Sequence, residues 1–97
     1  MATYITLLNF TDQGIRNVKE TTKRAEAFKA LAKKAEVTVK DIYWTLGEYD
    51  LVAVLEATDD ERVTAVGLSV GSLGNVRTQT LRAFSAEEIS RILAKMP

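Results

Sequence analysis

The order of strand-like and helix-like segments constrains the fold of this chain more than any other feature of its sequence. Strand composition, with many β-branched and aromatic residues, occurs in four short segments: residues 3–10, 37–46, 49–57 and 75–84. Gly47 and Glu48 separate the second segment from the third and predict a two-residue hairpin turn with glycine first.

Two of the intervals between these strands have the apolar spacing of amphipathic helices. Apolar or small side chains recur every three or four residues from Ile15 to Ala35, which predicts one long helix with Thr11 as its N-cap. The sequence TDDE at residues 58–61 is a capping-box pattern that places threonine at the cap. It predicts a second, shorter helix that carries three valines on one side: Val63, Val66 and Val70.

The resulting β-α-β-β-α-β order predicts an α+β fold with an antiparallel sheet, the ferredoxin-like plait. Right-handed crossovers would place both main helices on one face of this sheet. A second capping box, SAEE at residues 85–88, predicts a C-terminal helix whose apolar residues face inward. These residues are Ile89, Ile92, Leu93 and Met96. The length of 97 residues favours one domain over residues 1–97.

Two of the predicted strands carry apolar side chains on both faces. In the first strand, Ile5 and Leu7 point away from Tyr4 and Leu8, and residues 51–55 repeat this pattern. Because a sheet with one wet face alternates apolar and polar residues, the helix-free face is expected to be covered. The C-terminal helix is too short to cover it alone. The sequence therefore predicts a homodimer or higher homo-oligomer that packs sheet to sheet.

Composition narrows the chemistry that the chain can perform. It contains no cysteine and no histidine, which removes thiolate chemistry, disulfides and nucleophile–histidine pairs. The composition leaves open an all-carboxylate Mg²⁺ or Ca²⁺ site, but no segment resembles a calcium loop, so no metal site is expected. No cofactor is expected either. No apolar run is long enough to cross a membrane and no leader pattern opens the sequence, so a cytoplasmic location is expected.

The net charge is zero, but the charges are distributed unevenly. Residues 16–40 contain eight Lys or Arg against three Glu, whereas residues 41–61 contain seven Asp or Glu and no basic residue. A nucleic-acid-binding surface is usually basic without acidic residues nearby, so nucleic acid is not an expected partner. The two segments are better explained as solvated surfaces that could be complementary between subunits.

Three separated motifs resemble the GYD domain family of small bacterial proteins: NFTDQG, TLGEYDLVAVLEA and GSLGNVRTQTLRAF. The family takes its name from a Gly, Tyr, Asp signature like that in residues 47–50, where a glutamate separates the glycine from the tyrosine. The likeness spans essentially the whole chain. It implies a ferredoxin-like fold of the dimeric α/β-barrel type and no established biochemical activity.

Two aromatic-containing pairs are candidates for ligand binding. Tyr49 and Asp50 are neighbours on one predicted strand, so their side chains should point to opposite faces of the sheet. One interpretation is structural: Asp50 bonds backbone amides near the turn, and Tyr49 packs with its hydroxyl in water. The other is functional: one of the two residues lines a cavity. Tyr43 and Trp44 also face opposite ways. Either could line a pocket for a flat organic ligand, or belong to the core or a subunit interface.

Three arginines complete the set of candidates. Arg77 and Arg82 lie in the most polar predicted strand, where charges commonly discourage unwanted pairing at a sheet edge. Alternatively, one of them holds an anion such as a carboxylate in a pocket between sheet and helices. Arg16 lies near the start of the first predicted helix, where free amides can bind an anion, although Asp12 would repel it.

Three classes of function agree with these observations. The favoured class is a small-molecule-binding or sensory module with a pocket between sheet and helices. The second is a cofactor-free enzyme, oxygenase- or isomerase-like, in which Glu48, Tyr49 or Asp50 would transfer protons in the absence of histidine. The third is a structural or assembly protein that binds no ligand, which the basic and acidic segments support.

Overall fold

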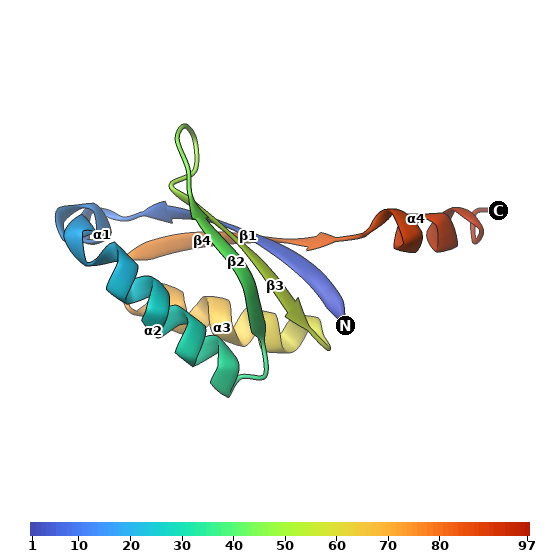
Figure 1. The fold of residues 1–97 in the computed structure, drawn as a ribbon, viewed down its shortest axis with the longest axis horizontal. Helices are drawn as coiled ribbons and strands as arrows, with labels where there is room; N and C mark the ends of the chain where they lie inside the picture. Colours follow the sequence, from blue (N-terminus) through green and yellow to red (C-terminus); the bar gives the residue numbers. More distant parts are fainter.

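The sheet in the computed structural model, which describes residues 1–97, has four antiparallel strands in the order β2-β3-β1-β4 (Figure 1). The strands are β1 (Ala2–Phe10), β2 (Thr38–Trp44), β3 (Leu51–Ala57) and β4 (Val76–Ala83). The helices are α1 (Asp12–Arg16), the 3-10 turn η1 (Val18–Glu20), α2 (Thr21–Lys34), α3 (Asp60–Ser72) and α4 (Ala86–Leu93). This arrangement confirms the predicted α+β ferredoxin-like plait with a C-terminal helix.

The core lies between the sheet and the pair α2 and α3, which cover the same face. Cross-strand partners on this face of β1 and β3 are all buried: Tyr4 with Leu55, Thr6 with Ala53, and Leu8 with Leu51. Ala32 of α2 and two valines of α3, Val63 and Val66, are buried against them. Thr6 is the polar member of this layer, and its hydroxyl is satisfied by the Thr80 hydroxyl at 3.1 Å.

The other face of the sheet has no helix over it (Figure 1). The register places Ile5 between Val54 of β3 and Leu81 of β4, and Leu7 beside Val52. Because directly opposed residues project on the same side of a sheet, these five side chains form one apolar surface. We call it the open sheet face. The predicted apolar character of both faces of the central strands is thus present in the structure.

The first connection is not the single long helix predicted from residue 15 to residue 35. α1 ends at Arg16, Asn17 leaves the helical conformation, and η1 precedes α2. The Asn17 side chain donates to the Gln13 carbonyl at 3.0 Å, an example of asparagine competing for backbone groups and ending a helix. Thr11 is the N-cap, as predicted, and its hydroxyl accepts from the Gly14 amide.

The loop between β2 and β3 is longer than the predicted two-residue turn, because β2 ends at Trp44 and β3 begins at Leu51. Asp50 bonds to both neighbouring segments: its amide donates to the Leu8 carbonyl of β1 at 2.9 Å, and its carbonyl accepts from the Thr45 amide at 2.9 Å. Gly47 has a φ of +97°, a conformation that favours glycine, which explains why this loop position is a glycine.

α3 begins one residue later than its capping-box pattern predicted. The N-cap is Asp59, whose carboxylate accepts from the Arg62 amide at 2.9 Å, and Thr58 lies outside the helix. Aspartate is a stronger N-cap than threonine, and the Arg62 guanidinium also pairs with it. The bond from the Arg62 amide is the main reason why the pKa of Asp59 lies below its usual range.

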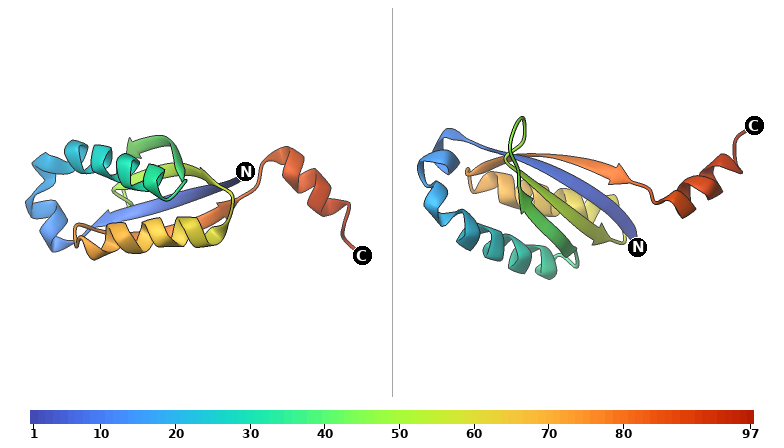
Figure 2. Two further views of the ribbon diagram at one scale, coloured as in Figure 1. Left: turned by 90° about the horizontal axis from the view of Figure 1, so that it is seen from below. Right: turned by 45° about the horizontal axis from the view of Figure 1, so that its top comes forward.

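α4 has the predicted capping box but does not pack against the sheet. The Ser85 hydroxyl accepts from the Glu88 amide, and the Glu88 carboxylate accepts from the Ser85 amide, which lowers the pKa of Glu88. The prediction that its apolar residues face inward is wrong for a single chain, because Ile89, Ile92, Leu93 and Met96 are all exposed. Both views in Figure 2 show α4 extending away from the body. None of the helices is long and apolar enough to cross a membrane.

The departure of α4 from the sheet is fixed by Arg82 at the end of β4. Its guanidinium lies 4.4 Å from the centre of the Phe84 ring and 5.6 Å from that of Tyr4, and it pairs with Glu88 at 3.4 Å. These contacts tie the first turn of α4 to the sheet edge. The apolar side of α4 remains exposed in the single chain.

Candidate functional site

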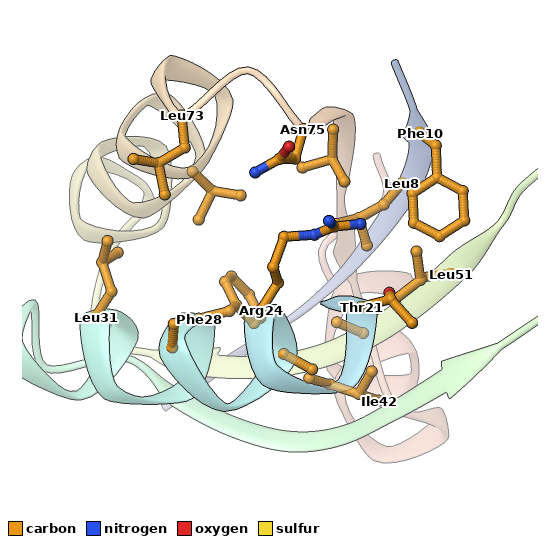
Figure 3. A pocket seen from close by; sticks show the side chains of 15 residues that line it. Leu8, Phe10, Thr21, Arg24, Phe28, Leu31, Ile42, Leu51, Leu73 and Asn75 are labelled. Carbon is orange, nitrogen blue, oxygen red and sulfur yellow. The ribbon is translucent and has the colours of Figure 1, made fainter. Parts of the chain in front are cut away.

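A cavity of about 140 Å³ lies between the sheet and the helices (Figure 3). Its walls are mainly apolar and come from β1, α2, β2, β3, the end of α3 and the segment that leads into β4. The largest apolar side chains are Leu8, Phe10, Phe28, Leu31, Ile42, Leu51 and Leu73. The buried Ala25 of α2 contributes only a methyl group to this wall, which leaves space between the layers, and the exposed Ala27 lines the outer part of the cavity.

Arg24 is the charged residue of the cavity wall. Its guanidinium donates to the carbonyls of Asn17 at 2.9 Å and Gly14 at 3.1 Å, and lies 5.9 Å from the centre of the Phe10 ring. Figure 3 shows the side chain rising from α2 across the cavity towards Leu8 and Phe10. No carboxylate lies within ion-pairing distance of Arg24.

Two further polar side chains line the cavity. The Asn75 side chain accepts from the Gln13 amide group at 2.9 Å, which leaves its own amino group as a donor. The Thr21 hydroxyl accepts from the indole nitrogen of Trp44 at 3.1 Å. Trp44 therefore lies behind the cavity wall on the helix side of the sheet, although it is not itself a lining residue.

Tyr49 and Asp50 diverge, as their neighbouring positions predicted. The Asp50 carboxylate accepts from the Phe10 amide at 2.9 Å, so it bonds backbone near the turn. The Tyr49 hydroxyl donates to the Gln79 side chain at 3.3 Å, and Gln79 opposes Leu7 on the open sheet face. Neither residue lines the cavity, and their part in ligand binding stays a prediction.

This divergence predicts unequal effects of substitution on stability. Asp50→Ala should cost about 1–3 kcal/mol, because it leaves the Phe10 amide without its acceptor. Tyr49→Phe should cost no more than about 0.5 kcal/mol, because its hydroxyl bond is exposed. Urea unfolding followed by circular dichroism measures both, with Glu48→Ala in the exposed loop as control. Equal losses in the Tyr49 and Asp50 variants would contradict this assignment.

The remaining candidates are not brought together by the fold. Tyr43 is exposed on the same side of the sheet as the open sheet face, with its hydroxyl 3.5 Å from Asp41. Arg77 is exposed opposite Asn9 at one end of β4, and Arg82 is at the other end. Arg16 is exposed at the end of α1. None of these arginines lines the cavity, and their role in anion binding stays a prediction.

Arg24 is the charged cavity residue that the sequence interpretation missed, and the polar Thr21 and Asn75 were missed as well. A signal was present, because Arg24 lies three residues after Thr21 and four before Phe28, both of which face the cavity. Residues at these spacings share one side of a helix. A basic residue within the inward-facing stripe of α2, instead of on its lysine-rich outer side, was the sign of a buried role.

A second polar cluster lies at the opposite end of β1. The buried Tyr4 hydroxyl donates to the Asp60 carboxylate in the first turn of α3. This bond, followed by burial of the ring, raises the pKa of Tyr4. With Arg82 over the Tyr4 ring, the cluster joins β1, α3 and β4. The cluster therefore stabilises the packing of these elements and is not part of the cavity.

The chain belongs to the GYD domain family, whose model matches residues 4–93. A relative from Thermus thermophilus, named glutamine synthetase and cystathionine beta-lyase binding protein, is 36% identical over 90 residues. That alignment covers 92% of this chain and 95% of the relative. The predicted family resemblance is thus confirmed.

Solved structures show the same fold. TTHA0845 from Thermus thermophilus is 30% identical, with a TM-score of 0.58 over 89% of this chain and 96% of that one. FFRP-DM1 is 23% identical, with a TM-score of 0.57 over 87% of this chain and 100% of that one. At this lower identity, the second structure supports the fold alone.

Proposed function

We propose that this protein is a homodimeric module that binds a small molecule in the cavity between its sheet and helices. The family and the name of the Thermus relative support a small binding or regulatory module in general. The observation that carries the more specific proposal is the cavity itself, an apolar space with few polar groups, as is typical of ligand sites. Its lining contains no carboxylate and no tyrosine, so it suits binding better than proton transfer, which an enzyme would need.

The dimer is supported by the open sheet face. Ile5 and Leu7 lie in a central strand, and Leu81 beside them is 42% exposed. A single chain buries only 13 of its 97 residues, so covering this face would enlarge a thin core considerably. A second copy provides a matching apolar surface by symmetry, in the sheet-to-sheet arrangement of a dimeric α/β barrel.

A second candidate function is the binding of another protein. The relative from Thermus is named for binding two enzymes. In this chain, the exposed apolar side of α4, with Ile89, Ile92 and Leu93, is a surface that a partner protein could cover. The two functions are compatible, because α4 extends away from the body (Figure 2) and contributes no residue to the lining of the cavity.

Native mass spectrometry of the protein purified from its own host tests the proposed function. The wild-type protein is expected at twice the chain mass of 10.7 kDa, with a retained small molecule. Ile5→Lys places a charge in the open sheet face and should give a folded monomer. Ile15→Lys, at an exposed position of α1, is the matched control and should stay dimeric.

Two results would contradict the proposal. A monomeric wild-type protein, confirmed by light scattering, would exclude the sheet-to-sheet dimer. A dimer that carries no small molecule would also contradict it, if it binds neither of two small aromatic probes, benzoate and benzyl alcohol. Protein binding would then be the better explanation.

A further inference from the structure

The size of the cavity limits what can fill it. A cavity of about 150 Å³ lined by leucine, isoleucine and phenylalanine stays dry and takes up benzene. The present cavity, of about 140 Å³, has a similar volume and a similar lining. It therefore has room for one six-membered ring.

The opening of the cavity follows from two lining residues that are exposed. Ala27 lies on α2, and Leu73 follows the end of α3. The cavity thus reaches the surface between these two helices, on the side of the molecule away from the open sheet face. A ligand could enter without separating the two subunits of the proposed dimer.

Arg24 provides a positive charge at the wall of this apolar space. Three of the six arginines pair with a carboxylate: Arg62, Arg82 and Arg91. Arg16 and Arg77 have no such partner but are exposed, whereas Arg24 is half-buried. Arg24 is therefore the arginine of this chain that combines partial burial with a charge no carboxylate neutralises.

The guanidinium of Arg24 also has free donors. Two of its five N–H groups donate to backbone carbonyls, which fixes its orientation, and the others have no acceptor in the chain. A carboxylate is the group that best satisfies both the charge and the planar pair of donors of an arginine. The free amino group of Asn75 is another donor on the same wall.

We propose that the cavity binds a monocyclic aromatic carboxylic acid, with the ring between α2 and the sheet and the carboxylate on Arg24. This inference rests on the proposed small-molecule function and adds the class of ligand. Benzoate is the probe for both parts, benzyl alcohol tests the ring without charge, and acetate tests the charge without the ring.

Isothermal titration calorimetry of the dimeric wild-type protein should detect benzoate binding, roughly 10- to 100-fold weaker binding of benzyl alcohol, and no binding of acetate. Arg24→Gln should weaken benzoate binding by the same factor and leave benzyl alcohol unaffected. Arg16→Gln, which removes an exposed unpaired arginine, is the matched control and should bind benzoate like the wild type.

A pair of variants in α3 tests the place of the ring. Val70→Phe fills part of the cavity and should abolish binding of both ring compounds. Leu68→Phe places the same aromatic side chain at an exposed position of the same helix and should change neither. If Arg24→Gln does not fold, Arg24→Lys keeps the charge without the planar fork and should weaken benzoate binding about tenfold.

The possible results separate the ligand class from the proposed function. Equal binding of benzoate and benzyl alcohol, or an Arg24→Gln variant that binds benzoate like the wild type, overturns the carboxylate proposal but leaves a small-molecule site. Retention of a different ligand from the host, without benzoate binding, overturns the ligand class alone. Absence of any bound or retained small molecule overturns both.

Discussion

Replacing Gly14 with alanine is expected to destabilise the protein by about 3 kcal/mol, at the upper end of the usual cost of overpacking. An added Cβ would lie 1.9 Å from the carbonyl oxygen of Asn75, far inside van der Waals contact. That oxygen belongs to the backbone and accepts from the Thr11 amide at 3.1 Å, so it cannot turn aside without losing this bond. The substitution would push α1 away from the segment that precedes β4.

Gly71→Ala is the matched control for this prediction. Gly71 lies in α3, and nothing lies within 4 Å of the position of its added Cβ. Because alanine favours a helix over glycine, this variant should be more stable by about 0.5–1 kcal/mol. Urea unfolding at equal protein concentration measures both changes. If both variants change the free energy of unfolding in the same direction, the close contact between α1 and Asn75 is contradicted.

Leu55→Ala should have the second large effect, a loss of about 2–5 kcal/mol in the free energy of unfolding. Leu55 is 2% exposed and is one of the two largest fully buried side chains. It opposes Tyr4 on one side and Val39 on the other, so both neighbouring strands limit how far the space left by the deleted carbons can collapse. The loss therefore combines the transfer free energy of the deleted carbons with most of the cost of the cavity that they leave.

Leu46→Ala removes the same atoms from a leucine that is 100% exposed in the β2–β3 loop. It should change stability by no more than about 0.5 kcal/mol. Chemical denaturation of the two variants side by side gives the comparison directly. A loss below about 1 kcal/mol in Leu55→Ala would mean that the core between sheet and helices repacks freely.

Those parts of the fold that depend on local patterns could be predicted from the sequence. The alternation of strands and helices, the Thr11 cap and the Ser85–Glu88 capping box each need only residues close together in the chain. The break at Asn17 could not be predicted in the same way, since the apolar spacing continues across it. The position of α1 depends on Gly14 meeting Asn75, a contact between distant segments.

The same distinction applies to the candidate site. The structure has the predicted divergence of Tyr49 and Asp50, although both residues lie in the loop before β3 and not within a strand. The location of a pocket between sheet and helices was also predicted. Its charged residue was not predicted, because the importance of Arg24 depends on the space that Ala25 of α2 leaves next to the sheet. The path of α4 likewise depends on Arg82, Phe84 and Tyr4 meeting at a sheet edge.

Trp44 gives the chain a spectroscopic property that needs no added label. It is the single tryptophan, its side chain is 45% exposed, and its indole nitrogen donates to Thr21 in the cavity wall. The fluorescence of an indole depends on the water and hydrogen bonds around it. The indole emission of this protein thus comes from one position, one hydrogen bond away from the cavity. An intensity or wavelength change on filling the cavity can therefore be assigned to a known residue.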